Sequence, residues 1–436
     1  MKKYNVTIIG AGSGYTPGVV NSLLMKRDKL PLNRITLMDN NAERLHIIGD
    51  FMDILVKERA PEVEFVQTTD RKTAFEGMDF LLAQIRSGCL KMRSLDEKIP
   101  MKYGVVGQET CGPGGFAFAM REIPEMISIA KDVVKYAPDA WIINYSNPTA
   151  IVAQAIRKKV PEVKNICICD VPPWQQKDMA YMLGGKPDEF QYTYFGLNHL
   201  GWFTHMYDNH GNDRLPELIN MIKENGLKSA EYTDPYWKKT AERLSQFVGH
   251  FDDALPTSYL QYYYYADEMF AEEDPNYTRA DYCIDHREKE TFNLCREGVK
   301  KGTAAGNNLS DTIHGDFIVD IASAIANNTN EKFIINVPNH GVISNFSNDS
   351  IIECTAIVNA SGYEPIAVGE IPTFQKGLME VVNAYEKLTV EAALEGSYQK
   401  ALKALTLNPI IPSVHVAKKI LDDYIEVNKE YFPELR

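Results

Sequence analysis

The amino-acid sequence predicts an α/β protein, with a Rossmann-like, doubly wound and mostly parallel sheet followed by a second, mainly helical α+β domain. Short apolar runs alternate with helix-like segments in the first 200 residues, and a glycine-rich turn follows the first run. Beyond this region the pattern becomes mostly helical. These observations predict a Rossmann-like domain over 1–195 and a catalytic, substrate-binding and oligomerisation domain over 196–436.

The elements follow from hydrophobic periodicity. Apolar runs predict strands at 4–10, 34–39, 79–85, 140–146 and 165–170, with one more strand leaving the sheet at 191–202. Apolar residues that recur at intervals of three and four predict helices at 41–58 and 121–137, and in the second domain at 214–224, 280–299, 315–327, 373–386, 390–405 and 412–429. Strands that alternate with helices favour parallel pairing.

The composition of the chain restricts the classes of molecule that it can bind. The 436 residues include 46 basic and 59 acidic side chains, a formal charge of -13, which disfavours nucleic acid. No apolar run is long enough to span a membrane, and no signal-peptide pattern precedes the first strand, so we expect a cytoplasmic protein without a membrane partner. The seven cysteines are odd in number and scattered, which indicates reduced thiols.

The first turn indicates a dinucleotide. Gly10, Gly12 and Gly14 follow an apolar strand and precede a helix, where backbone N–H groups can approach a pyrophosphate. Tyr15 stands where the usual fingerprint has its third glycine. Asp39, at the end of the second strand, has the spacing of the acid that binds the ribose 2′-hydroxyl, which favours NAD over NADP. The alternative is a tight turn followed by a helix-capping aspartate.

Polar side chains also follow the other predicted strands, and ligands bind at the carboxyl ends of such strands. They are Arg86, the segment NYSNPTA at 144–150, Cys169 with Asp170, and Asn198 with His199. A thiol and an imidazole suit a borderline divalent metal, but two ligands do not define a site. The alternative is a buried structural cysteine beside a hydrogen-bonded histidine. Cys167, deeper in its strand, is expected in the core.

Motifs along almost the whole chain resemble the family-4 glycoside hydrolases, which are NAD- and metal-dependent glycosidases. The motifs are GQETCGPGG at 107–115, NYSNPTA at 144–150, CDVP at 169–172, GLNHLGW at 196–202 and PTSYLQYYYY at 256–265. Within the family, an aspartate after the metal-binding cysteine, followed by proline, resembles the 6-phospho-α-glucosidases. The resemblance implies hydrolysis of 6-phospho-α-glucosides, for example maltose 6′-phosphate, to glucose 6-phosphate and an aglycone.

The resemblance also implies a mechanism in which the sugar is oxidised at C3 by NAD⁺, loses its C2 proton, expels the leaving group, adds water and is reduced again. It assigns the metal to Cys169 and His199, with Mn²⁺ as the first expectation and Fe, Co or Ni left open. Asp170 would protonate the leaving oxygen, which calls for a raised pKa, although it also stands where it could cap a helix. Tyr259 would be the base, although it begins a tyrosine-rich run typical of packing.

The same resemblance places Arg93, Asn147 and Arg279 on the 6-phosphate, and we expect these arginines to lack a partner without it. Glu109 and Asn198 are expected on the substrate, without an assigned step, and His340 stays unassigned. The alternatives are a 6-phospho-β-glucosidase or unphosphorylated α-glycosidase of the same family, an NAD-dependent hydroxy-acid dehydrogenase, and a non-catalytic NAD-sensing module. The resemblance suggests a homodimer or homotetramer.

Overall fold

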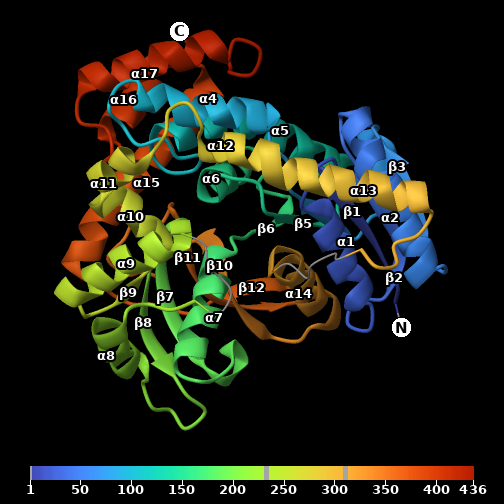
Figure 1. Ribbon diagram of the computed structural model, residues 1–436, viewed down its shortest axis with the longest axis horizontal. Helices are drawn as coiled ribbons and strands as arrows, with labels where there is room; N and C mark the ends of the chain where they lie inside the picture. The colour runs from blue at the N-terminus through green and yellow to red at the C-terminus, as the bar shows by residue number, and fades with distance from the viewer. Residues whose placement is uncertain (1, 230–234, 308–312) are drawn as a thin grey trace.

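The computed structural model describes residues 2–229, 235–307 and 313–436. Its strands form one 12-stranded sheet in the order β3-β2-β1-β4-β5-β6-β10-β11-β7-β8-β9, with β12 paired to β11 (Figure 1). The sheet therefore runs without a break across residue 196, where the sequence places a domain boundary. Among the described residues, no helix is long and apolar enough to cross a membrane.

The first half of the sheet is parallel. Its strands are β1 (Tyr4–Ile9), β2 (Leu32–Met38), β3 (Glu64–Thr68), β4 (Phe80–Ala83), β5 (Trp141–Asn144) and β6 (Lys164–Cys167). The expected strands are confirmed, although the fifth ends at Cys167 and leaves Cys169 in the following loop. The sequence analysis missed β3, a short edge strand without a continuous apolar run.

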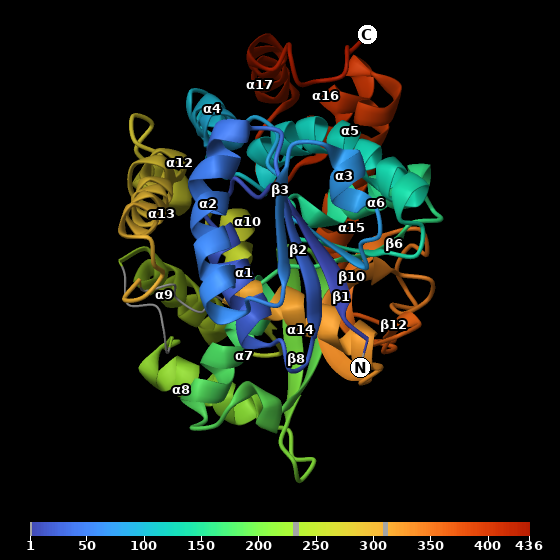
Figure 2. The ribbon, with the colours of Figure 1, turned by 90° about the vertical axis from the view of Figure 1, so that its right-hand side faces the viewer.

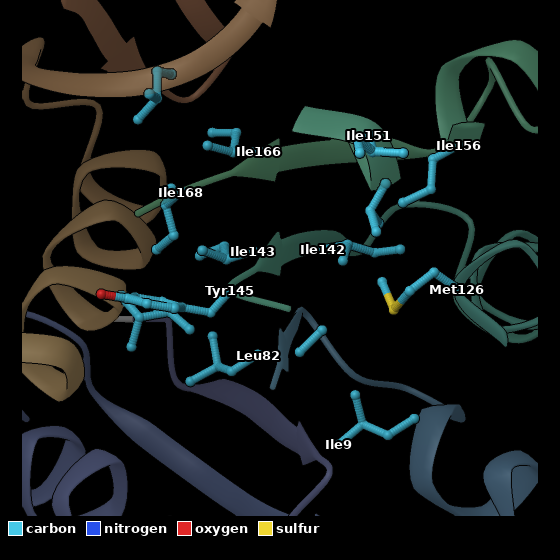
Figure 3. Close-up of a cluster of buried hydrophobic side chains, with 14 of the residues drawn as sticks. Ile9, Leu82, Met126, Ile142, Ile143, Tyr145, Ile151, Ile156, Ile166 and Ile168 are labelled. Carbon is cyan, nitrogen blue, oxygen red and sulfur yellow. The ribbon is translucent and has the colours of Figure 1, made fainter. Parts of the chain in front are cut away.

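Helices cover both faces of this half, as in a doubly wound fold. They are α1 (Thr16–Met25), α2 (Ala42–Arg59), α3 (Arg71–Phe75), α4 (Cys89–Met101), α5 (Gly112–Tyr136), α6 (Thr149–Lys159) and α7 (Val171–Met182). Figure 2 shows α1 and α2 on one side of the sheet and α3, α5 and α6 on the other. Isoleucines of β1, β5 and β6 fill the core between the layers, and Tyr145 extends from this core toward α14 (Figure 3).

The second half of the sheet is antiparallel. Its strands are β7 (Gln191–Leu197), β8 (Leu200–Tyr207), β9 (Leu255–Pro256), β10 (Glu331–Pro338), β11 (Ile351–Asn359) and β12 (Gly362–Pro365). The expected single strand at 191–202 is wrong, because the chain turns at Asn198 and His199 to form the β7–β8 hairpin. The sequence analysis missed β9 to β12. The two halves join where Asn336 of β10 pairs with Cys167 of β6.

The remaining helices pack around this half and against helices of the first half. They are α8 (Leu215–Asn225), α9 (Pro235–His250), α10 (Gln261–Tyr264), α11 (Ala266–Glu272), α12 (Arg279–Tyr282), α13 (Lys289–Lys301), α14 (Ile313–Asn327), α15 (Thr373–Glu395), α16 (Tyr398–Leu407) and α17 (Val414–Val427). The short turns η1 (Pro187–Glu189), η2 (Ser258–Leu260) and the π-helical η3 (Cys283–Glu288) connect them. The two helices expected at 373–386 and 390–405 are one long α15 and then α16, because the first break comes at Gly396.

Several helices of the second half also pack on the first, and α13 is one of them. Helix α13 packs along α2 and crosses in front of it in Figure 1. The contact is close because Gly298 has no side chain, and a Cβ atom at this position would overlap the ring of Phe51. Phe51 is fully buried in α2, so the ring has no space into which to move. The position of α13 on the N-terminal layers is therefore fixed by packing.

We predict opposite effects of two glycine-to-alanine substitutions in helices. Gly298→Ala should lower the free energy of unfolding by about 1–3 kcal/mol, because the new methyl group overpacks Phe51. Gly377→Ala in α15 is the control, since a Cβ there meets no atom within 4 Å. This variant should gain about 0.5–1 kcal/mol from helix propensity. Thermal unfolding of both variants and the wild type measures these effects. A melting temperature of Gly298→Ala equal to or above that of the wild type would contradict the tight α13–α2 contact.

Candidate active site

A cavity of about 1410 Å³ lies at the carboxyl ends of the parallel strands. Its walls include most of the side chains expected in the site, namely Gly10, Gly12, Gly14, Asp39, Arg93, Glu109, Asn147, Asp170, His199, Tyr259 and Arg279. Cys169 and Asn198 are buried and do not line it. The structure thus gathers eleven residues, from positions 10 to 279 of the chain, around one space, as expected at the strand ends of a doubly wound sheet.

The glycine turn forms one end of the cavity. Gly10 has a φ of +77°, and a Cβ there would come within 2.7 Å of the Gln84 carbonyl oxygen. A Cβ on Gly12 would lie 2.7 Å from Cβ of Arg44 and 3.0 Å from Oδ2 of Asp39. Asp39 holds the turn, because its Oδ2 accepts a hydrogen bond from the Gly12 N–H at 2.8 Å. The open backbone, with an acid at the end of β2, fits a dinucleotide.

Cys169 and His199 meet although they follow strands in different halves of the sheet. The Cys169 Sγ lies 3.3 Å from Nε2 of His199. His199 reaches this position from the tip of the β7–β8 hairpin with a φ of +61°. Burial lowers the pKa of His199 to about 4, so the imidazole is neutral, the form that binds metals. Burial, with the nearby carboxylates of Asp170 and Glu353, raises the pKa of the Cys169 thiol.

These two donors fit a borderline divalent cation. Across the described ranges, no group of three or more His, Cys, Asp or Glu side chains is placed to hold a metal. A cation at Cys169 and His199 therefore needs further ligands from water or substrate, as an open catalytic site does. A bound cation would also favour the Cys169 thiolate, which burial otherwise disfavours.

Tyr259 lies directly against the metal-ligand candidate His199. The two rings stack with centroids 4.0 Å apart and planes 9° apart. Burial, with the negative charge of Glu109 next, raises the pKa of Tyr259 well above its usual value. The phenol therefore stays protonated unless a cation is bound beside it. This arrangement distinguishes Tyr259 from Tyr262, Tyr263 and Tyr264, which pack against the core or other aromatic rings.

Asp170 stands at the N-cap position of α7, but its side chain makes no capping hydrogen bond. It faces α14 instead, with Oδ2 3.7 Å from Nδ1 of His314. Desolvation would raise the pKa of Asp170, but His314 and Tyr145 outweigh this effect and hold it below the usual value. The raised pKa expected for this residue is therefore not present. Proton donation by Asp170 would require its surroundings to change when a substrate binds.

Glu109 is the centre of a charged cluster. Its Oε2 lies 2.7 Å from Arg86 and 3.1 Å from Arg93, and Arg93 also pairs with Glu97 at 2.7 Å. Burial would raise the pKa of Glu109, but the two guanidinium groups hold it below the usual value. The expectation that Arg93 lacks a partner is wrong, since Glu97 and Glu109 both neutralise it. Arg93 can still present its remaining N–H groups to the cavity that it lines.

Arg279 has a different environment. Its guanidinium lies over the rings of Tyr282 and Tyr236, 4.9 and 5.7 Å from their centroids. The ion pairs of the described residues do not include Arg279, so its N–H groups face the cavity without a carboxylate. Aromatic faces keep a guanidinium planar and oriented while leaving its edge available for an anion. Asn147 lines the same cavity from the loop that follows β5.

A hydrogen bond between Asn198 and Glu353 helps to fix the position of the β7–β8 hairpin at the site. The Asn198 amide donates to Oε1 of Glu353 at 3.1 Å, and Tyr194 donates to Oε2 at 2.7 Å. Asn336 donates to Glu353 and to the Cys167 carbonyl oxygen. Burial raises the pKa of Glu353 to about 7. This arrangement puts Asn198 behind the His199 tip, where it positions the hairpin, and the cavity wall does not include it.

The sequence analysis missed Glu353 and His314 as parts of the site. Glu353 had a detectable signal, because a charged residue in the apolar run IIECTAIV needs buried partners. His314 had none, since it begins a helix far from every motif. It now lies against Asp170, and its ring contacts that of Tyr145 with centroids 3.7 Å apart and planes tilted by 40°. His340, left unassigned, contacts Arg157 on the surface.

Known proteins resemble this chain in both sequence and structure. A model of the family 4 glycosyl hydrolases matches residues 5–185, and a model of the C-terminal domain of that family matches 194–411. Phospho-alpha-glucosidase PagL of Clostridium acetobutylicum is 46% identical over all of both chains. A 6-phospho-alpha-glucosidase from gut microorganisms, solved with NAD and Mn²⁺, is 43% identical with a TM-score of 0.97 over all of both chains. Another, solved with NAD and glucose-6-phosphate, is 41% identical with a TM-score of 0.96, again over all of both chains.

We predict that Co²⁺, used as a spectroscopic probe, will bind through Cys169 and His199. The wild-type chain should show a thiolate-to-cobalt absorption band, because a bound cation removes the thiol proton. Cys169→Ser should lose the band, and His199→Ala should bind Co²⁺ more weakly. Cys111→Ser is the matched control, since Cys111 is also buried near the cavity but lies outside the pair. A band that survives in Cys169→Ser would assign the metal to other ligands.

Proposed function

This chain belongs to family 4 of the glycosyl hydrolases, and from that premise we propose that it is an NAD- and divalent-metal-dependent 6-phospho-α-glucosidase. It would hydrolyse substrates such as maltose 6′-phosphate to glucose 6-phosphate and the aglycone. One observation carries the proposal. A single cavity joins a dinucleotide cradle, the His199–Tyr259 stack beside Cys169, and the uncompensated guanidinium of Arg279.

The charge of the cavity supports a phosphorylated sugar. Arg86 and Arg93 are neutralised by Glu109 and Glu97, whereas Arg279 lies over two aromatic rings and is in no ion pair among the described residues. A guanidinium that is in none of the described ion pairs favours a bound anion. We propose that Arg279 makes the principal contact with the 6-phosphate and that Arg93 and Asn147 add hydrogen bonds. Glu109 orients the two arginines toward the sugar.

The donor sets fit both cofactors. Gly10, Gly12, Gly14 and Asp39 would hold NAD, while Cys169 and His199 would hold the metal, for which Mn²⁺ is the first choice. When bound, NAD⁺ supplies a reversible hydride acceptor at C3 of the sugar, and the metal supplies a Lewis acid at the sugar hydroxyls. The protein's task is then to hold the sugar and to move protons at C2 and at the glycosidic oxygen.

Tyr259 and Asp170 are placed for these two protons. We assign removal of the C2 proton to Tyr259, because its ring lies against His199, where a bound cation would lower the raised pKa of the phenol. Asp170 follows Cys169 directly and would hold a proton at the leaving oxygen. Because His314 and Tyr145 keep Asp170 ionised in the free enzyme, it takes up this proton with the substrate.

Location and assembly follow from the same proposal. A sugar carrying a charged phosphate ester does not cross a lipid bilayer unaided, so we place the enzyme in the cytoplasm, with its substrate. We also propose a homodimer or homotetramer, as the family resemblance suggests. Measuring the mass in solution by light scattering would decide between these states and a monomer.

Arg279 should determine the preference for phosphorylated substrates. We predict that the wild type hydrolyses p-nitrophenyl α-glucoside 6-phosphate and leaves the unphosphorylated and natural β-linked analogues almost untouched. Arg279→Met should lower kcat/KM for the phosphorylated substrate about tenfold or more, because a charge-assisted hydrogen bond is lost. Arg296→Met is the control, since Arg296 also lies over an aromatic ring but outside the cavity. Equal turnover with and without the phosphate would contradict the assignment.

The proton transfer at C2 has a direct isotopic test. Turnover in D₂O should give glucose 6-phosphate with deuterium at C2 and none at C3, as determined by NMR of the product. Tyr259→Phe should slow hydrolysis and exchange together, because it removes the base but keeps the stacked ring. Tyr264→Phe is the control on a neighbouring tyrosine outside the cavity. If the product retains all its C2 protium, the roles given to NAD, the metal and Tyr259 are wrong.

A further inference from the structure

Two conflicting signals for cofactor choice lie close together in the sequence. Asp39, at the end of β2, favours NAD, because a carboxylate binds the ribose 2′-hydroxyl and repels a 2′-phosphate. Arg44 follows five positions later in the first turn of α2, and an arginine near this acid is the feature that accommodates the 2′-phosphate of NADP. The sequence alone does not decide which residue prevails.

The structure places Arg44 at the cofactor end of the cavity. A Cβ atom on Gly12 would lie 2.7 Å from Cβ of Arg44 and 3.0 Å from Oδ2 of Asp39, so both side chains reach the glycine turn. Both side chains line the cavity. A guanidinium on this part of α2 would be available to a phosphate on the ribose that Asp39 binds, unless another group occupies it.

Glu288 occupies it. Nη1 of Arg44 lies 3.0 Å from Oε1 of Glu288, and Nη2 lies 2.6 Å from Oε2, a two-point pair. The two side chains are only 21% and 19% exposed, so water screens the pair little. Phe292 covers one face of the guanidinium, 4.9 Å from its central carbon. Both terminal nitrogens of Arg44 are therefore engaged before any cofactor arrives.

Glu288 comes from the second half of the chain, 244 positions from Arg44. It ends η3 and directly precedes α13, the helix that Gly298 allows to pack closely on Phe51 of α2. The carboxylate thus stands on an element whose position on α2 is fixed by buried packing. It is not a mobile surface side chain that a phosphate could easily displace.

We propose that Glu288 makes the chain selective for NAD over NADP, by holding Arg44 in an ion pair that leaves it unable to bind a 2′-phosphate. The phosphate would have to break the Arg44–Glu288 pair and would then face two carboxylates, Asp39 and Glu288, with one cation between them. This inference rests on the dinucleotide site proposed above. It extends that site by one residue from the opposite half of the molecule.

The test measures cofactor binding without turnover, by isothermal titration calorimetry on the full chain freed of bound nucleotide. Wild type should bind NAD⁺ far more tightly than NADP⁺. Glu288→Gln should bind NADP⁺ about tenfold or more tightly than wild type, because one charge-assisted hydrogen bond to Arg44 becomes available. The affinity for NAD⁺ should change much less. Glu297→Gln, in the adjoining α13 and ion-paired with Lys301, should change neither.

A double variant assigns the gain to Arg44. Glu288→Gln combined with Arg44→Gln should return NADP⁺ binding to the wild-type level, since the liberated cation is gone. Should Glu288→Gln unfold, Glu288→Asp replaces it, because the shorter side chain cannot maintain both contacts and should give a smaller gain. Unchanged NADP⁺ affinity in a folded Glu288 variant, or a gain that persists without Arg44, overturns the inference while leaving the proposed function intact. Failure of the wild type to bind NAD⁺ overturns both.

Discussion

The buried carboxylate of Glu353 holds together the two halves of the sheet on which the site depends. It receives hydrogen bonds from Tyr194 and Asn198 on the β7 side and from Asn336 on β10. Asn336 continues to the Cys167 carbonyl oxygen of β6, two residues before Cys169. The backbone contributes only one residue pair at the β6–β10 junction, Asn336 with Cys167. Side-chain hydrogen bonds therefore fix the distance between the strands that carry Cys169 and His199, and buried networks of this kind tolerate little rearrangement.

Four of the arginines that line the cavity differ in the groups that hold them. Arg44, Arg86 and Arg93 each pair with a carboxylate of the protein, whereas Arg279 is held by aromatic faces. Compensated guanidinium groups order the walls and limit which anions can enter. The uncompensated one keeps its attraction for a ligand. This difference supports the proposal that one cavity accepts a pyrophosphate beside the glycine turn and a sugar phosphate beside Arg279.

Local patterns in the sequence predicted the parallel half of the fold, the glycine turn and the positions of Cys169, Asp170 and His199. These features could be predicted because strand ends and glycine turns depend on residues that are adjacent in the sequence. They did not predict the β7–β8 hairpin, since Asn198 and His199 interrupt an apolar run without a glycine or proline to mark the turn. They also missed β10 to β12, whose pairing with β6 and β7 depends on contacts between distant residues. The assignments at Tyr259 and Arg279 came from family resemblance, because no periodicity distinguishes one tyrosine or arginine from its neighbours.

Partners that lie far apart in the sequence account for the rest. Glu109 pairs with Arg93, His314 faces Asp170, and Glu288 pairs with Arg44, in each case through tertiary packing, whereas Glu97 reaches Arg93 from one turn further along the same helix. The pKa of Asp170 was misjudged for this reason. Burial alone would have raised it, but the sequence gives no sign that an imidazole from α14 comes within 3.7 Å.

The return of α13 to α2 bears on how the protein is made. A nascent chain leaves the ribosome with its N-terminal strands first, and such strands begin to fold before the rest is synthesised. Here the outer surface of α2 stays uncovered until residues 289–301 have emerged, when Gly298 can pack on Phe51 and Glu288 can reach Arg44. The Arg44–Glu288 pair is thus completed only in the last third of synthesis. An incomplete chain that ends before residue 288 would carry the glycine turn and Arg44 without the carboxylate that pairs with Arg44.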